Sequence, residues 1–268
     1  MSIASYTVPT ANIVAMVVTF LIAVVLPIIL CIVWKCKAKS KLYPLFLGCG
    51  TFVVFALVLE QICHVVVQLL TGTLLMDNIV FYAIYGGLAA GVFEETGRLL
   101  AMKFCMKKDL DKKNAIMYGI GHGGIEAMLL IGMTYLSNLV TAILINSQGV
   151  ERLTQTLNGQ VPGSADAFWV QVAPLWELPA SQFLMAGVER ISAMGLHIVM
   201  SYLVFWAVKN KKLGWYGLSI LVHAVTNAGI VLLAQRCPLA VVEAVLAGVV
   251  AVLLIGVVFH YRKQEVVH

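Results

Sequence analysis

The sequence predicts an all-α, polytopic membrane protein with seven transmembrane helices. Hydrophobic residues make up 61% of its 268 residues and charged residues only 12%, and the mean hydropathy is +0.94. Soluble proteins differ strongly from this composition. Apolar stretches recur along the chain, each close to the roughly 20 residues that cross the hydrocarbon core of a bilayer. The chain is therefore expected to form a single integral membrane domain over residues 1–268.

The seven expected spans follow one another through short connections, with one exception. They occupy residues of about 11–34, 43–70, 79–102, 114–145, 182–208, 214–235 and 238–259. The first span is not expected to be a cleaved signal peptide, because no Lys or Arg precedes it and no Ala-x-Ala-type site follows it. The long connection, about 146–181, carries Trp169 and Trp176 and is expected to lie outside, on the membrane surface. An interfacial aromatic anchor is the preferred interpretation, and a partial lid is the alternative.

Basic residues determine the expected orientation. Most of the 18 Lys and Arg residues follow the first, third, fifth and seventh spans, whereas only Arg152 and Arg236 lie in the connections on the opposite side. Because basic residues are enriched in cytoplasmic loops, the N-terminus is expected outside and the C-terminus in the cytoplasm of a multi-pass plasma-membrane protein. The same short blocks account for the net charge of +5, so no nucleic-acid partner is expected.

Polar and ionisable residues within the third to sixth spans gather at one depth. Counted from the basic blocks at about 1.5 Å per residue, they lie roughly 12–22 Å from the cytoplasmic ends. They are Glu94, Glu95, Arg98, His122, Glu126, His197, Ser201, His223 and Asn227. Residues four apart project from one helix face, and four such pairs occur in this set. Because ionisable groups inside a membrane need a partner or water, these spans are expected to enclose one water-accessible cavity.

The residue types in this layer suit hydrolysis of a peptide bond. Two adjacent glutamates are not expected to ionise equally, so Arg98 can hold one as a carboxylate while the other acts as a general base on water. A histidine followed one turn later by an asparagine, as in His223 and Asn227, offers hydrogen-bond donors for an oxyanion. Glycines before Glu94 and around His122 allow close helix packing and leave room for substrate or water.

These motifs also resemble those of a known group of enzymes. In order, Glu94-Glu95-Thr96-Gly97-Arg98, His122-Gly-Gly-Ile-Glu126, His197 and His223-Ala-Val-Thr-Asn227 are similar to the motifs of the CPBP superfamily of intramembrane proteases. That superfamily includes CAAX prenyl endopeptidases and bacteriocin-processing enzymes, and its YhfC-like branch is the most similar. The resemblance covers a motif-bearing core of about 79–235.

The resemblance implies an intramembrane endopeptidase of the glutamic type that needs no cofactor. Glu94 or Glu95 would activate water, and His223 with Asn227 would stabilise the oxyanion. This sequence departs from the usual superfamily motifs in two places. The motif EExxxR is one residue shorter here and ends at Arg98, and the position of the motif FxxxH reads His122-x-x-x-Glu126. The roles of His122 and Glu126 and the choice between the two glutamates stay open from the sequence.

Two other functions fit the same residues. Histidines and carboxylates bind zinc, so a zinc-dependent metalloprotease is the first alternative, although no HExxH motif is present. Its candidate ligands are His122, Glu126, His197 and His223. A cation or proton transporter is the second alternative, because intramembrane ionisable residues also form ion relays. Glu60 and Arg190 are instead expected to form a structural salt bridge. The expected partners are the lipid bilayer and a peptide or membrane-protein substrate.

Overall fold

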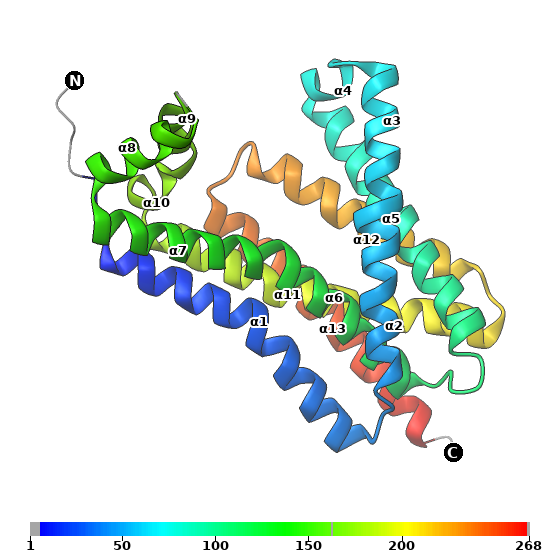
Figure 1. Cartoon of the computed structure of the whole chain (residues 1–268). Helices are drawn as coiled ribbons and strands as arrows, with labels where there is room; N and C mark the ends of the chain where they lie inside the picture. The colour runs from blue at the N-terminus through cyan, green and yellow to red at the C-terminus, as the bar shows by residue number, and fades with distance from the viewer. Residues whose placement is uncertain (1–5, 162, 267–268) are drawn as a thin grey trace.

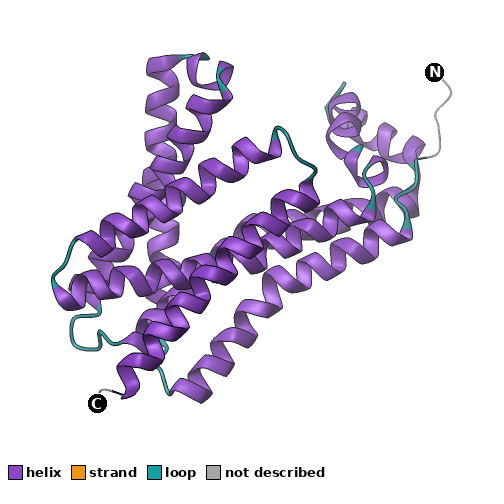
Figure 2. Cartoon of the chain, turned by 180° about the vertical axis from the view of Figure 1, so that it is seen from behind, coloured by secondary structure: helices purple, strands orange, loops and turns teal. Residues whose placement is uncertain are grey.

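The predicted all-α membrane fold is confirmed. A computed structural model describes residues 6–161 and 163–266, which form helices joined by turns and short loops, without a strand (Figures 1 and 2). Residues 1–5, 162 and 267–268 of the predicted single domain lie outside the described residues. Within the described part, six helical runs are long and apolar enough to cross a membrane. They are Thr10–Ala38, Tyr43–Thr71, Lys112–Gln148, Ala180–Asn210, Gly214–Ala234 and Leu239–Lys263.

The remaining predicted span corresponds to α5, Ile79–Leu100. Its 22 residues give a length of about 33 Å at 1.5 Å per residue, enough for the roughly 30 Å hydrocarbon core. Its adjacent glutamates lower its hydropathy, and it is not among the six apolar runs. The count of seven spans and the orientation therefore stay predictions.

Several elements join end to end into long rods. The elements before the long connection are α1 (Thr10–Ala38), α2 (Tyr43–Thr51), η1 (Phe52–Glu60), α3 (Gln61–Thr71), α4 (Leu74–Asp77), α5 (Ile79–Leu100), η2 (Ala101–Cys105), α6 (Lys112–Glu126), η3 (Ala127–Gly132) and α7 (Met133–Gln148). Those that follow are α8 (Val150–Gln160), α9 (Ser164–Val172), α10 (Pro174–Glu177), α11 (Ala180–Asn210), α12 (Gly214–Ala234) and α13 (Leu239–Val266). The η segments are π-helical and continue α2, α5 and α6 without a break.

Helix α11 is the central element of the fold. It packs against α1, α6, α12 and α13, while α5 packs along α12 and α6 lies against α2. Figure 1 shows α3, α4 and the start of α5 rising apart from α7 and the α8–α10 segment. In both views the α3–α5 hairpin and α8–α10 lie at the end of the molecule opposite the C-terminus. We call this end, which also holds the start of α1, the N-terminal face.

The long connection folds into the short helices α8, α9 and α10. The ring of Trp176 stacks on that of Tyr6 with centroids 4.8 Å apart, and Nε1 of Trp169 donates to Oγ1 of Thr154 at 2.9 Å. Both indoles pack against a buried cluster formed with α1, α7 and α11. The two tryptophans therefore fasten the connection to the helix bundle.

Glycines allow α6 to approach its neighbours closely. A Cβ atom on Gly121 would overlap the backbone of Leu45 in α2, and one on Gly123 would lie 3.1 Å from Cα of Met194 in α11. Small residues at such crossings let membrane helices pack through their backbones. His122, which stands between these two glycines, is thereby held at 0% exposure between α2 and α11.

Replacing Gly121 by alanine is expected to destabilise the protein by about 1–3 kcal/mol, because the added methyl group forces the two backbones apart. Thermal unfolding of the detergent-purified protein measures the effect. Gly50→Ala is the matched control on α2, since no atom lies within 4 Å of a Cβ placed there. Equal unfolding temperatures for both variants would contradict the packing argument.

Candidate active site and metal centre

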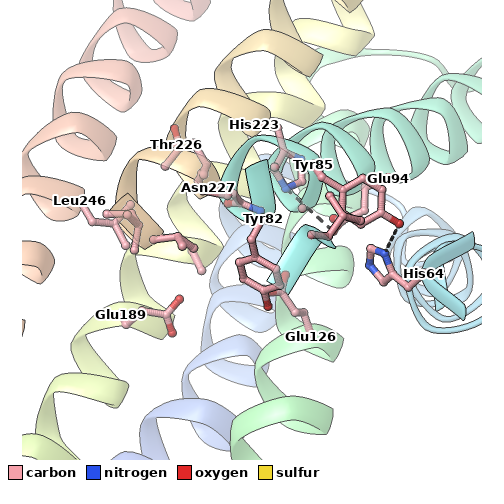
Figure 3. Close-up of a pocket in the computed structure, with 18 of the residues that line it drawn as sticks. His64, Tyr82, Tyr85, Glu94, Glu126, Glu189, His223, Thr226, Asn227 and Leu246 are labelled. Carbon is pink, nitrogen blue, oxygen red and sulfur yellow. Dashed lines mark hydrogen bonds and ion pairs between the residues drawn. The ribbon is translucent and has the colours of Figure 1, made fainter. Parts of the chain in front are cut away.

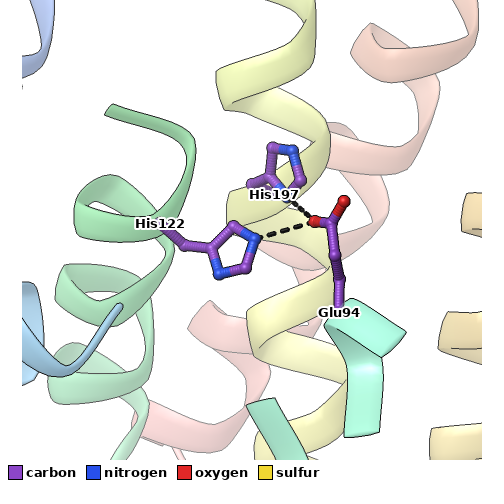
Figure 4. Close-up of side chains that lie close together, drawn as sticks. All are labelled: Glu94, His122 and His197. Carbon is purple, nitrogen blue, oxygen red and sulfur yellow. Dashed lines mark hydrogen bonds and ion pairs between the residues drawn. The ribbon is translucent and has the colours of Figure 1, made fainter. Parts of the chain in front are cut away.

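Glu94 on α5 faces two histidines from two other helices. Its Oε2 atom lies 2.8 Å from Nε2 of His122 on α6 and 3.8 Å from Nδ1 of His197 on α11 (Figure 4). The two imidazole rings have centroids 4.8 Å apart. One possible ligand atom from each residue lies within 4.8 Å of the other two, and all three residues are buried. Three elements distant in sequence thus converge on one point.

The neighbouring Glu95 has different partners. Its Oε2 atom accepts a hydrogen bond from Oγ of Ser219 at 2.5 Å and lies 3.2 Å from Nε of Arg98. Its Oε1 atom lies 3.1 Å from Nδ1 of His223, whose Nε2 is 3.9 Å from Oε1 of Glu94. Arg98 therefore ion-pairs with Glu95, three residues away, and not with Glu94. The two glutamates therefore differ: Glu95 is held by Arg98, Ser219 and His223, whereas Glu94 faces His122 and His197.

Arg98 ties α5 to α11 inside the protein. Its Nη1 atom donates to the backbone oxygen of His197 at 2.8 Å and to the hydroxyl of Ser201, and its Nη2 atom is 3.2 Å from Nδ1 of His197. The side chain has no exposed surface. A buried guanidinium is tolerated only with such partners, because an unpaired charge is costly away from water. Arg98 thus orients Glu95 and His197 together.

Glu126 contacts both His197 and Arg190. Its Oε2 atom is 2.5 Å from Nε2 of His197, and its Oε1 atom accepts a hydrogen bond from Nη1 of Arg190 at 2.8 Å. Arg190 also pairs with Glu189. The expected salt bridge between Glu60 and Arg190 is therefore wrong. Glu60, at the end of η1, instead lies 3.2 Å from Nε2 of His64, one turn further along the same helical run.

That cavity has a volume of about 520 Å³ and is lined by side chains from α3, α5, α6, α11, α12 and α13 (Figure 3). Five predicted site residues line it: Glu94, Glu126, His197, His223 and Asn227. The other three, Glu95, Arg98 and His122, are buried behind its surface with 0% exposure. All eight predicted residues thus gather around one cavity. Its described lining residues include none from the long connection, so α8–α10 do not cover it.

Ser219 belongs to this arrangement but was not among the predicted site residues. It lies on α12 one turn before His223, so the spacing of four residues that connects His223 to Asn227 also connects His223 to Ser219. The signal was present in the sequence, but a lone serine within a membrane helix commonly bonds to its own backbone. Only the close packing of α5 on α12 turns its hydroxyl to Glu95.

Comparison with known proteins gives the family. The chain matches the YhfC intramembrane metalloprotease family over residues 22–260. This protein belongs to that family. A Bacillus subtilis (strain 168) relative, named "Uncharacterized membrane protein YhfC", is 40% identical over 213 residues, which cover 79% of this chain and 81% of the relative. No solved structure matches the chain. The resemblance to YhfC-like proteins is thereby confirmed, as is the membrane location.

The YhfC family name implies a metal ion, and the residues around Glu94 fit one. One carboxylate with two imidazoles is a ligand set of catalytic zinc sites, which keep a fourth position open. Histidine ligands usually turn their second nitrogen to a carboxylate or carbonyl, and Nε2 of His197 lies against Glu126 in this way. The nitrogen turned toward Glu94 is Nδ1, which also lies 3.2 Å from Nη2 of Arg98, so a metal ion at this atom would replace the contact with Arg98. The geometry thus favours Glu94, His122 and His197 as ligands, with Glu126 as a support for His197.

Proposed function

We propose that this protein is a metal-dependent endopeptidase that hydrolyses peptide bonds in the membrane-embedded cavity. The observation that carries the proposal is the cluster of Glu94, His122 and His197, whose possible ligand atoms lie within 4.8 Å of one another beside the cavity. These three residues would hold a zinc-type ion. When bound, such an ion polarises a carbonyl group and promotes the ionisation of water.

His223 is proposed to move the proton of the attacking water. Glu95, held by Arg98 and Ser219, faces Nδ1 of His223 and keeps the proton of the neutral imidazole on that atom. The Nε2 atom is then free to accept a proton, as in other carboxylate-oriented histidine bases. It later returns the proton to the leaving amine.

Asn227 is proposed to bind the carbonyl oxygen of the substrate. It lies one turn beyond His223 on α12, and it lines the same cavity. Its side-chain amide has two N–H donors, and donors aimed at a developing oxyanion stabilise the transition state of acyl transfer. Asn227 is half-buried, so its amide stays accessible to a substrate in the cavity.

The glutamic-type mechanism predicted from the sequence is the second candidate. It is favoured by the 2.8 Å contact between Oε2 of Glu94 and Nε2 of His122, which keeps a carboxylate beside the cavity. In that version Glu94 accepts the proton of the attacking water, and no metal takes part. A transporter would use the same residues as a cation or proton relay without cleaving peptides.

Metal analysis of the detergent-purified protein separates these candidates. Wild type is compared with His122→Ala and His197→Ala, and cleavage of a mixed peptide pool is followed by mass spectrometry with and without chelator. About one zinc per chain, lost in both variants, together with chelator-sensitive cleavage, is the expected result. Metal-free protein that cleaves in chelator would instead establish the glutamic mechanism. Bound metal without any cleavage would favour a transporter.

Glu126→Gln is expected to weaken metal binding by about 10–100-fold, because the neutral amide orients His197 less well than the carboxylate does. Competition with a chelating dye measures the dissociation constant directly. Glu60→Gln is the matched control, since Glu60 is also a carboxylate beside a histidine but pairs with His64 and not with a proposed ligand. An unchanged dissociation constant in Glu126→Gln would contradict the supporting role.

A further inference from the structure

The cavity extends from the site toward the N-terminal face. Gly72 at the end of α3 and Tyr82 near the start of α5 line its outer part, whereas Glu94 and His223 line its inner part. The α3–α4 turn is at the N-terminal face in Figure 1. Glu94 is twelve positions after Tyr82 on α5, which is about 18 Å along a helix. The cavity is therefore a passage between that face and the candidate site.

We propose that this passage is a substrate-binding chamber, entered from the N-terminal face, for a short non-helical peptide segment. An intact transmembrane helix is not its substrate. The proposal rests on the proposed function, because the chamber ends at the residues assigned to hydrolysis. It adds the direction of entry and the conformation of the substrate.

The dimensions of the chamber decide between an extended chain and a helix. The volume of about 520 Å³ is that open to the centres of water molecules, so over roughly 18 Å it corresponds to a mean width of about 6 Å for those centres. Adding a water radius of about 1.4 Å on each side gives about 9 Å between the walls. A helix with its side chains is about 10–12 Å wide, so it does not fit. An extended chain needs roughly 5 Å in the plane of its hydrogen bonds and about 10 Å across its side chains, a smaller cross-section than that of a helix, and it rises about 3.3 Å per residue. The chamber thus accommodates about five extended residues.

Polar groups on facing walls suit such an occupant. A non-helical segment exposes backbone N–H and C=O groups, which must find partners away from water. Tyr82 on α5 and Thr226 on α12 offer hydroxyl groups (Figure 3). Arg190 on α11, which pairs with Glu126 and Glu189, lines a third wall. Apolar residues such as Ile230 and Leu246 also line the cavity. A helical substrate would not need these hydrogen-bonding groups, because its backbone N–H and C=O groups bond to one another within the helix.

Gly86 provides a position at which the chamber can be probed or filled. It lines the cavity, and no atom lies within 4 Å of a Cβ placed on it. Gly229 on α12 is equally open but is exposed on the outer surface and does not line the cavity. A side chain added at Gly86 therefore projects into the chamber, whereas one added at Gly229 projects away from it.

Entry is tested first by an experiment that does not depend on activity. Gly86→Cys and Gly229→Cys are made in a variant whose six native cysteines are replaced, and membrane vesicles of both orientations receive a membrane-impermeant maleimide. Glu151→Cys on α8 marks the N-terminal face, and Lys107→Cys marks the opposite face. We expect the maleimide to label Gly86→Cys only in the vesicle orientation in which it labels Glu151→Cys. It should label Gly229→Cys in neither orientation. The entry route is overturned if the Gly86→Cys thiol resists labelling. It is also overturned if this thiol is labelled in the vesicle orientation in which Lys107→Cys is labelled.

Occupancy is tested by filling the chamber. Gly86→Leu is expected to lower cleavage of the mixed peptide pool by at least about tenfold while zinc content is unchanged, because the leucine displaces substrate but not the ligands. Gly229→Leu should cleave like wild type. Equal cleavage by both variants, or cutting of a single-span reporter helix at mid-membrane as fast as the peptides, overturns the proposal. If wild type cleaves nothing, the proposed function fails, and labelling still decides whether the passage is open.

Discussion

Glu94→Gln is expected to abolish peptide cleavage, by about 10³-fold or more, and to remove the bound metal ion. Glutamine has nearly the same shape, but it lacks the negative charge that a cation and two flanking histidines require. The 2.8 Å and 3.8 Å distances to His122 and His197 place this carboxylate at the centre of the donor set. Cleavage of the peptide pool and zinc content are measured on the same preparation.

Two comparisons make the Glu94 result specific. Glu243→Gln changes another buried carboxylate, on α13 outside the cavity lining, and should retain cleavage and metal. Glu95→Gln should retain the metal but cleave slowly, because Glu95 acts on His223 and not within the donor set. A Glu94→Gln protein that keeps its zinc and its activity would refute the assignment. Loss of zinc in Glu95→Gln, with zinc retained in Glu94→Gln, would mean that Glu95 and not Glu94 binds the metal ion.

Arg98→Met is expected to destabilise the folded protein by about 3–5 kcal/mol, the usual effect of removing one partner of a buried ion pair. The backbone oxygen of His197 keeps the hydrogen bond from Oγ of Ser201, but the substitution leaves Glu95 without its cation and the Ser201 oxygen without its donor. Both groups have no access to water at their buried positions. Thermal unfolding in detergent and the yield of folded protein measure the loss.

A double variant shows whether the unpaired carboxylate causes the Arg98 effect. Adding Glu95→Gln to Arg98→Met removes the uncompensated charge and should recover part of the stability, as expected for residues in one network. Arg236→Met, at an exposed arginine, should change stability by no more than about 0.5 kcal/mol. An Arg98→Met protein that unfolds like wild type would contradict the buried network.

Much of the fold could be predicted from the sequence, because the bilayer constrains it. The expected spans agree closely with the helices: the span predicted at about 182–208 is α11, Ala180–Asn210, and that at about 214–235 is α12, Gly214–Ala234. Hydrocarbon thickness sets the length of each apolar run, and basic blocks mark the ends. Counting residues from those ends then placed the polar side chains at one depth, and all of them gather around one cavity.

The tertiary structure alone decided which side chains are partners. The position of a residue along its helix gives its depth in the membrane to within about one helical turn. The rotation of each helix about its own axis depends on how its surface packs against its neighbours. Contacts at Gly121 and Gly123 turn His122 toward Glu94, and comparable close contacts between α5 and α12 turn Ser219 toward Glu95. The sequence therefore determined the membrane fold and the polar layer. Helix packing decided that Arg98 holds Glu95, that Arg190 holds Glu126, and that Glu94 faces the histidines, because these pairings depend on interhelical distances of a few ångströms.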